Sequence, residues 1–479
     1  MTAAEQETAP PAPALPESAS LLLPVTVACG VFMTSLDQNA VVTALPAMGE
    51  TLNRAPTQLG LLVTAYVASL IITMPIGGWA AERFGLRNSY CFAVLVFGAA
   101  SALCGMVSDM WSLVAARVLQ GFGGALMGTL GQVAVLQSFP RNRTLKINLY
   151  VSLAGQTGPL VGPLLGGALT TYISWRWIFF VNVPLAMAAA VAALVFFPSG
   201  ARSVRSPFDF RGFALVGAGM VLLVLGMNSL AARDTTHATT ALQIGLAMAI
   251  LAVATLYCLR SPNPILDLNL LRIRTFRISF LTGGALDTIG MSSVIFLLPL
   301  MFQLGFGMSA VAAGSLTFAA AVGSIITRFF MPAVLRRFGF RRLLVVNTPI
   351  CAALVAGFAF MQATTPVWIV LGYIFVFGVF RSAQWASTGN LSYSDIAPEQ
   401  LARFSALYYI LWQLAVAISV GTAAALLSLL AGGGRAEVGD FRVLFVIEGL
   451  VTLAALLAYR KLTPRDGAHV SGNVVAGSD

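Results

Sequence analysis

The chain contains little charge for its length. Of its 479 residues, 10% are charged and 58% are hydrophobic, whereas a soluble globular protein carries about 25% charged residues. This excludes a soluble fold and predicts an all-α integral membrane protein. The net charge of +10 does not indicate a nucleic-acid partner, because the basic residues occur in small groups between apolar segments. The lipid bilayer is the partner that such groups fit.

Residues that usually build cofactor or catalytic sites are scarce. The five cysteines lie in apolar segments without the Cys-x-x-Cys spacing of a metal or redox site. The only lysines, Lys146 and Lys461, do not follow a glycine, so the chain has no Gly-x-x-x-x-Gly-Lys phosphate loop. The two histidines lie in a short loop and in the C-terminal tail. We therefore predict no enzyme activity, no metal and no cofactor.

Apolar runs of about 20 residues, the length that crosses a bilayer, recur along the chain. They predict fourteen membrane-spanning helices, at residues 21–45, 60–81, 89–107, 111–136, 147–169, 178–197, 213–230, 241–259, 278–301, 311–334, 343–361, 367–386, 407–430 and 443–459. Residues 1–20 are rich in proline, alanine and glutamate and lack the basic start of a signal peptide. We expect them to form a disordered cytoplasmic tail.

The distribution of basic residues predicts the topology. Loops after even-numbered spans, together with the C-terminal tail, hold twenty of the 28 lysines and arginines, and loops after odd-numbered spans hold five. Cytoplasmic loops are the ones enriched in lysine and arginine. Both termini are therefore predicted to be cytoplasmic.

An internal repeat predicts the domain organisation. The segment Glu82–Arg87 follows the second span, and the similar segment Arg336–Arg341 follows the tenth. Such spacing fits two six-helix bundles with two helices inserted between them, and repeated bundles are typical of secondary transporters. The predicted parts are a tail at 1–20, an N-terminal bundle at 21–197, a linker with two extra helices at 198–277, a C-terminal bundle at 278–461 and a cytoplasmic tail at 462–479.

Ionisable residues inside spans are costly and mark functional sites. Two acids and two arginines fall at matching depths, Asp37 with Arg117 in the first half and Asp287 with Arg381 in the second. A buried carboxylate can either pair with an arginine or accept a proton. We therefore predict two acid–base pairs for proton coupling; static structural ion pairs are the alternative.

Neutral polar residues inside the spans are candidates for a substrate cavity, although they can equally hold helices together. The candidates are Asn39, Gln120, Gln156, Gln303 and Gln384.

A run of glycines and prolines interrupts the fifth span. Gly158, Gly162 and Gly166 recur every four residues, and Pro163 and Gly167 lie beside them. Each interior glycine costs about 1 kcal/mol relative to alanine, so a packed neighbour must compensate. The spacing predicts a smooth face against which another helix lies close and can move; an ordinary packing face is the alternative.

Five motifs together resemble the fourteen-helix drug:proton antiporters of the major facilitator superfamily. They are residues 36–46, 78–87, 117–125, 155–167 and 174–184. The resemblance implies the major facilitator fold in a bacterial cytoplasmic (inner) membrane. It also implies export of small, amphipathic compounds, as in multidrug efflux, in exchange for protons, by rocking of the two bundles about a central cavity.

The resemblance also implies roles for particular residues. Gly158, Gly162, Pro163, Gly166 and Gly167 would form the antiporter motif, and Arg117 would tune the proton site. A conformational latch would consist of Gly78, Glu82, Arg83, Gly85 and Arg87. This sequence departs from the family pattern at Glu82, where aspartate is usual, and at Leu86, where a basic residue is usual.

Several functional alternatives stay open at this stage. A proton-coupled symporter, or an exporter of one specific metabolite, would use the same fold. Acids in the cavity favour cationic substrates, whereas arginines favour anionic ones, so the substrate class is undetermined. A periplasmic adaptor protein is a further candidate partner. A sensor or scaffold is disfavoured because the loops are short and carry no soluble domain.

Overall fold

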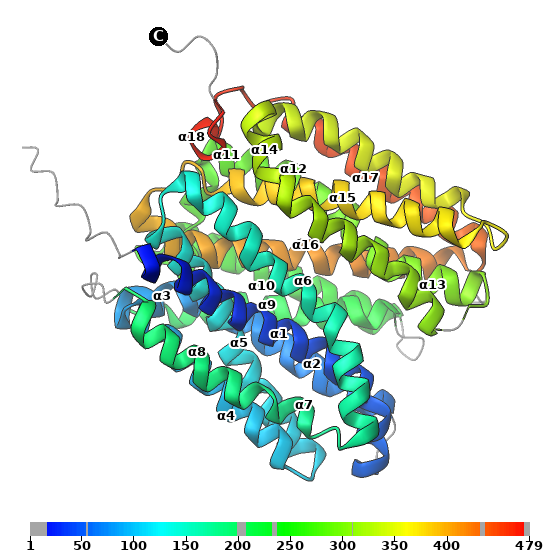
Figure 1. The fold of residues 1–479 in the computed structure, drawn as a ribbon, viewed down its shortest axis with the longest axis horizontal. Coiled ribbons are helices and arrows are strands. Elements are labelled where there is room, and N and C mark those ends of the chain that lie inside the picture. Colours follow the sequence, from blue (N-terminus) through cyan, green and yellow to red (C-terminus); the bar gives the residue numbers. More distant parts are fainter. Residues whose placement is uncertain are drawn as a thin grey trace, which may run out of the picture.

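The computed structural model describes residues 17–53, 56–198, 207–231, 237–308, 310–431 and 436–473, and the regular elements within them are all helical (Figure 1). The helices before residue 198, called the first half below, are α1 (Glu17–Leu52), α2 (Pro56–Thr73), α3 (Ile76–Phe84), α4 (Leu86–Met106), α5 (Met110–Ser138), α6 (Arg141–Tyr172), α7 (Trp177–Phe180) and α8 (Asn182–Phe196).

Two further helices link this half to the second. The linker helices are α9 (Phe210–Ala231) and α10 (His237–Arg260). The second half consists of η1 (Leu268–Arg272), α11 (Arg274–Phe276), η2 (Arg277–Thr282), α12 (Gly283–Ser292), α13 (Val294–Leu300), η3 (Met301–Gly305), α14 (Ala310–Gly357), η4 (Phe358–Phe360), α15 (Val367–Ser392), η5 (Pro398–Gln400), α16 (Leu401–Leu430) and α17 (Val438–Tyr459), followed by the short α18 (Ala468–Ser471).

Eleven described helices are long and apolar enough to cross a membrane, and a twelfth is added if α2 and α3, which meet at a 53° bend, form one span. This confirms a multi-pass, all-helical membrane protein. One of the eleven, α14, contains Gly339 with φ 69°. This left-handed conformation favours glycine and interrupts the helix in the segment where the sequence predicts a loop between two spans. The count of fourteen stays a prediction.

Each half has apolar clusters of its own, and a further apolar cluster joins both halves to the linker helices. α9 packs against α2 of the first half and against α16 of the second. In Figure 1 the blue-to-teal helices and the yellow-to-red helices form two groups, with α9 and α10 along the seam. Large apolar side chains such as Val191, Leu242 and Leu256 are exposed on the outside. A contiguous apolar exterior of this kind suits a lipid environment.

Local signals in the sequence explain where some helices begin. Asp109 precedes α5, and its carboxylate accepts the backbone N–H of Ser112 at 2.9 Å. This is the N-cap arrangement that satisfies an otherwise unpaired donor. Hydrogen bonds from the Ser112 side chain and backbone lower the pKa of Asp109 below its usual value. The helix that carries Arg117 and Gln120 therefore starts at a defined residue.

Candidate functional site

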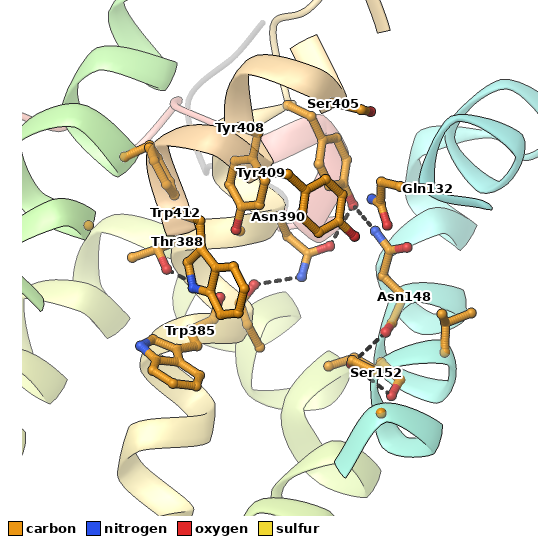
Figure 2. Close-up of a pocket in the computed structure, with 18 of the residues that line it drawn as sticks. Gln132, Asn148, Ser152, Trp385, Thr388, Asn390, Ser405, Tyr408, Tyr409 and Trp412 are labelled. Atoms are coloured by element: carbon orange, nitrogen blue, oxygen red, sulfur yellow. Dashed lines mark hydrogen bonds between the residues drawn. The ribbon is translucent and has the colours of Figure 1, made fainter. Parts of the chain in front are cut away.

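A cavity of about 370 Å³ lies between the two halves. Helices α1, α5 and α6 supply its wall on one side, and η2, α12, α14, α15 and α16 supply the other. Figure 2 shows aromatic and amide side chains from α15 and α16 facing polar side chains of α6. The polar and aromatic lining residues include Gln132, Asn148, Ser152, Phe280, Arg328, Trp385, Asn390, Tyr393, Tyr408, Tyr409 and Trp412.

Most of the predicted cavity residues lie elsewhere. Asn39, Gln120, Gln303 and Gln384 do not line this cavity, and the side chain of Gln156 lies outside what the structure describes. Asn39 donates to the carbonyl oxygen of residue 35 at 2.7 Å. The two glutamines at 120 and 384 are buried in side-chain networks within their own halves. Amides that are chemically suited to a cavity are thus used to join helices.

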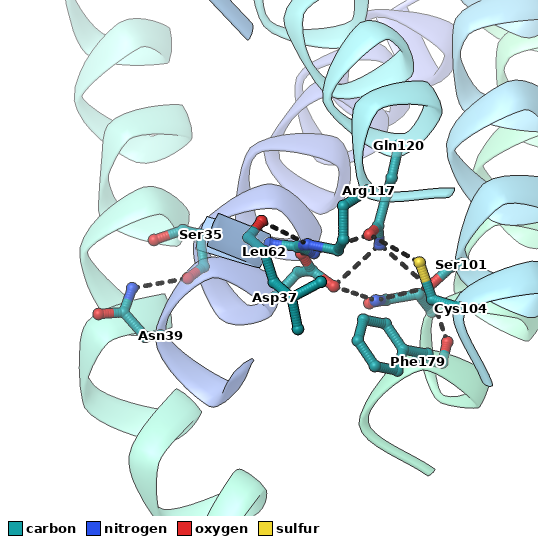
Figure 3. A network of polar contacts seen from close by, with 10 residues as sticks. Ser35, Asp37, Asn39, Leu62, Ser101, Cys104, Arg117, Gln120 and Phe179 are labelled. Carbon is teal, nitrogen blue, oxygen red and sulfur yellow. Dashed lines mark hydrogen bonds and ion pairs between the residues drawn. The ribbon is translucent and has the colours of Figure 1, made fainter. Parts of the chain in front are cut away.

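The first network surrounds Asp37 of α1 (Figure 3). Arg117 of α5 donates to Asp37 Oδ2 at 2.5 Å and to Gln120 Oε1 at 2.7 Å. Gln120 and Asn182 donate to Asp37 Oδ1 at 2.9 and 3.2 Å. Both amides also donate to Ser101 Oγ at 3.1 Å. The acid is fully buried, and its charge is balanced by one guanidinium and two neutral donors.

The guanidinium of this pair is held from two further sides. It lies 4.2 Å from the ring centroid of Tyr66, and its Nε donates to the carbonyl oxygen of Leu62 at 3.4 Å. Arg117 is only 1% exposed. A buried ion pair offsets its desolvation only when its remaining donors and acceptors are satisfied, and here they largely are. The predicted pairing of Asp37 with Arg117 is present in the structure.

The second network surrounds Asp287 of α12. Gln384 of α15 donates to Asp287 Oδ2 at 2.5 Å, and the hydroxyl of Tyr459 donates to the same oxygen. Gln384 also donates to Thr348 Oγ1 at 2.8 Å and accepts from Asn347 at 2.7 Å. Asp287 is fully buried, but its described partners are all neutral. One oxygen of the carboxyl group is therefore hydrogen-bonded to neutral groups, whereas Oδ1 has no hydrogen-bond partner within the described structure.

The two networks share one plan. In each half the acid comes from the first membrane-spanning segment, which is α1 in the first half and Arg274–Gly305, including α12, in the second. The glutamine comes from α5 or α15, and a hydroxyl comes from α4 or the second part of α14. The sequence signal for this plan is an Arg-x-x-Gln pattern that occurs as Arg117–Gln120 and again as Arg381–Gln384. The two side chains of the pattern lie about one turn apart on the helix surface, so the pattern alone does not say which of them meets the acid.

Arg381 does not form the ion pair with Asp287 that the sequence predicts. Its guanidinium lies 4.7 Å from the ring centroid of Trp385 and 5.7 Å from that of Phe377. Its Nε and one terminal nitrogen have no hydrogen-bond partner in the described structure. The physical reason is helix rotation: Gln384, about one turn further along α15, faces Asp287 instead.

An ion pair joins the two halves at the predicted latch. Arg403 of α16 binds Glu82 of α3, with 3.0 Å between Nε and Oε1. Arg83 is exposed and forms no ion pair within the described residues, whereas Arg87 donates to the carbonyl oxygen of Phe197 at 2.8 Å. Arg87 thus ties α4 to the end of α8 within the first half. The residue that bridges the halves is Glu82, and Arg403 is the partner that the sequence does not reveal.

The two latch glycines have different structural roles. Gly85 has φ 80°, a conformation that favours glycine and allows the sharp turn between α3 and α4. Gly78 is buried in α3, and it lines the same small pocket as Glu82 and Arg403. Both positions therefore shape the segment that presents Glu82 to the second half.

The glycine stripe of α6 packs directly on α1, the helix that carries the first acid. A Cβ added at Gly162 would lie 2.7 Å from Asn39 Cβ, and one at Gly166 would lie 2.6 Å from Thr43 Oγ1. A Cβ at Gly158 would collide with a serine side chain of α1. These contacts agree with the predicted close approach of a partner helix.

Not every residue of the predicted antiporter motif belongs to the glycine stripe that contacts α1. A Cβ at Gly167 would meet nothing within 4 Å, so this glycine faces away from α1. The side chain of Pro163 lies outside what the structure describes. The hydroxyl of Ser35 donates to the carbonyl oxygen of Gly155 at 2.7 Å, which adds a polar link between α1 and α6.

A many-span helical protein with an interface cavity and a buried acid in a polar network in each half belongs to the class of membrane transporters. The family model described as Major Facilitator Superfamily matches residues 27–420. The chain belongs to this superfamily, and it is a transporter and not an enzyme.

Relatives and solved structures agree with that assignment. The chain is 34% identical over 403 residues to the multidrug resistance protein MdtD of Klebsiella pneumoniae, covering 84% of this chain and 85% of that protein. It is 32% identical over 404 residues to MdtD of Escherichia coli K12, with the same coverage.

Two solved structures share the fold. One is the proton:xylose symporter XylE bound to 6-bromo-6-deoxy-D-glucose, with a TM-score of 0.62 at 15% identity, covering 94% of this chain and 97% of that one. The other is the human organic anion transporter MFSD10 (TETRAN), with a TM-score of 0.62 at 16% identity, covering 90% and 99%. Identities this low establish the fold alone.

Proposed function

We propose that the protein exports small, amphipathic compounds across the bacterial inner membrane in exchange for protons, as a multidrug efflux transporter. The observation that carries the proposal is the buried ion pair between Asp37 and Arg117, 2.5 Å apart. Asp37 lies on α1, the helix against which the glycine stripe packs, and Arg117 lies on α5. The name of the MdtD relatives supports the substrate class.

In this proposal Asp37 carries the transported proton. A proton on Asp37 removes the charge that attracts Arg117, so the ion pair weakens when the acid is protonated. Gln120 and Asn182 can still hydrogen-bond to the neutral acid, because each amide offers both a donor and an acceptor. Asn182 Oδ1 has no partner in the described structure, so an acceptor is available for the proton of the neutral acid after a small rotation of the amide.

The glycine stripe would convert this local change into motion of α1 against α6. Asn39 contacts Gly162 and lies two residues after Asp37 on α1. A shift of α1 that accompanies loss of the ion pair would therefore change the α1–α6 contact directly. Interfaces this closely packed have few intermediate arrangements, because packed helices slide between discrete positions.

The bridge from Glu82 to Arg403 would hold the halves together in the state seen here. This bridge lies at the helix ends that the distribution of basic residues assigns to the cytoplasm. The proposed topology has fourteen spans and cytoplasmic termini, with bundles at 21–197 and 278–461, a two-helix linker at 198–277 and tails at 1–20 and 462–479. In that topology the closed latch corresponds to an outward-facing state.

The proposal is tested in everted membrane vesicles with an imposed pH gradient, acidic inside. Addition of a transported amphipathic dye or antibiotic should dissipate the gradient, because an antiporter exchanges internal protons for external substrate. Asp37→Asn should abolish this response while substrate binding persists. A symporter would instead carry protons inward together with the substrate. A parent-like response from Asp37→Asn would refute the assignment of the proton site.

The same assay in proteoliposomes tests whether transport requires a partner protein. Purified chain reconstituted alone should transport substrate and protons across the lipid bilayer. If transport appeared only after addition of a periplasmic adaptor, the functional unit would be a larger assembly.

A further inference from the structure

Building on the transport function proposed above, we infer that the cavity between the halves binds an anionic, aromatic substrate, with Arg381 and Arg328 as the anion site. The acidic group would lie at the guanidinium groups, and the ring would lie among the aromatic side chains of α15 and α16. The inference names a substrate class that the name of the MdtD relatives does not give.

The charge of the cavity lining is the first observation. Among the described lining residues, Arg328 is the only charged one, and no carboxylate is among them. One terminal nitrogen of Arg328 donates to Ser152 Oγ of α6, while its Nε has no described partner. A cavity lined in this way attracts anions and repels cations.

Arg381 is the second observation. It is 9% exposed, and its Nε and one terminal nitrogen are unpartnered within the described residues. Arg381 does not itself line the cavity, but its guanidinium stacks on Trp385, which does, so it lies one side chain behind the cavity wall. Stacking on a ring occupies the face of a guanidinium but leaves its edge donors free. Those edge donors match the oxygens of a carboxylate, sulfonate or phosphate.

The helix contact between α14 and α15 brings the two arginines to the same region. Thr327 of α14 donates to the carbonyl oxygen of Val379 of α15 at 3.1 Å, and Ser382 donates back to the carbonyl oxygen of Ser324 at 3.2 Å. Arg328 follows Thr327 directly, and Arg381 follows Val379 by two residues. Both guanidinium groups therefore extend from one interhelical contact.

The contrast with the first half shows why these charges need a ligand. Arg117 occupies the position in its helix that Arg381 occupies in the repeated Arg-x-x-Gln pattern, and it is fully engaged with Asp37, Gln120 and the ring of Tyr66. Arg381 has no such acid, because Asp287 is held by neutral donors. A buried cation without a counterion is costly, and a bound anion would offset that cost.

The remaining lining suits the rest of an aromatic substrate. Trp385, Tyr408, Tyr409 and Trp412 present rings to the cavity (Figure 2). The volume of about 370 Å³ falls within the range of about 300–1000 Å³ that is usual for small-molecule sites. An aromatic anion could thus bury its ring and its charge in one site.

The test compares two probes of the same shape, 2-naphthoate and its neutral amide, 2-naphthamide, by calorimetric titration of the purified full chain in detergent. The parent should bind the naphthoate at least about tenfold more tightly, the factor expected for one charge-assisted hydrogen bond. Arg381→Gln should reduce that preference to near unity without weakening amide binding, and Arg328→Gln should reduce it in part. Arg260→Gln, at an exposed position outside the cavity, is the matched control and should retain the full preference.

Thermal unfolding separates lost recognition from lost folding. Without ligand, Arg381→Gln should unfold at the same temperature as the parent or higher, because it removes an unpaired buried charge. Arg381→Lys should retain part of the preference. A parent that does not prefer naphthoate, whether it binds both probes equally or neither, overturns the anion site, and so does an undiminished preference in Arg381→Gln.

These outcomes are independent of the proposed antiport. Binding in detergent requires no pH gradient. Absence of the anion preference with intact, Asp37-dependent proton exchange would overturn this inference alone. An intact preference without proton exchange would overturn the antiport alone.

Discussion

Substitution of Gly162 tests whether the α1–α6 contact is a functional interface. In Gly162→Ala the new Cβ would lie 2.7 Å from Asn39 Cβ and 3.2 Å from the backbone nitrogen of Ala40 and the carbonyl oxygen of Leu36. The preferred distance between two carbon atoms in van der Waals contact is about 3.5–4.0 Å. Two of the three neighbours are backbone atoms, so rotation of a side chain cannot relieve the overlap. The helices must therefore separate by about 1 Å.

This displacement should affect transport more than folding. Overpacking of this size costs about 1–3 kcal/mol, which a well-packed bundle can tolerate. Asp37 lies two residues before Asn39 on the displaced helix and is 2.5 Å from Arg117, so a shift of about 1 Å disrupts that pair. We expect Gly162→Ala to lower the transport rate about tenfold, equivalent to about 1.4 kcal/mol, and Gly162→Leu to abolish transport while still inserting into the membrane.

The assay is gradient dissipation in everted vesicles at matched expression, with thermal unfolding of the purified variants in detergent. Gly167→Ala is the control within the same motif, because its Cβ would meet nothing within 4 Å. It should transport like the parent and be equally stable or slightly more stable, since alanine is the better helix former. Parent-like transport by Gly162→Leu would refute the reasoning and leave the stripe as an ordinary packing face.

The remaining predictions concern charge and topology. Asp37→Asn leaves the buried Arg117 without a counterion, so we expect it to lower the free energy of unfolding in detergent by about 3 kcal/mol or more. Asp287→Asn should lower it by less than about 1.5 kcal/mol, because the partners of Asp287 are neutral. Equal losses in the two variants would contradict this account. Glu82→Arg and Arg403→Glu should each impair vesicle transport, and the double exchange should restore it if the ion pair itself matters. A reporter fused after Asp479 should be active only in the cytoplasm, and activity outside would overturn the proposed topology.

The sequence predicts axial position well and helix rotation poorly. Hydropathy and charge place Asp37 and Arg117 at one depth, and the structure joins them. The same reasoning places Asp287 and Arg381 at one depth, but depth does not specify which face of α15 meets α12. Gln384, about one turn away, takes the place beside Asp287. Rotation is decided by the packing of the whole helix, which a count of residues from the membrane surface cannot capture.

Contacts between the halves are the other feature that the sequence does not show. Glu82 belongs to a recognisable motif, but Arg403 lies 321 residues away in a segment with no repeat or spacing that links the two. The role of amide residues is ambiguous in the sequence for a different reason. A glutamine has the same chemistry whether it lines a cavity or joins helices, so Gln120 and Gln384 could not be assigned to networks without neighbours.

The two halves repeat one framework and complete it differently, which would divide the proposed functions between them. In the first half, the arginine of the Arg-x-x-Gln pattern forms an ion pair with its own acid, so in the proposed mechanism this half would respond to a proton without any substrate. In the second half, the arginine turns from the acid toward the cavity wall and keeps unpaired donors. Proton binding and substrate binding would then occur at separate sites. Coupling between the proton site and the substrate site would depend on movement of the two halves relative to each other. The Glu82–Arg403 ion pair would oppose separation of the halves at the end where it lies.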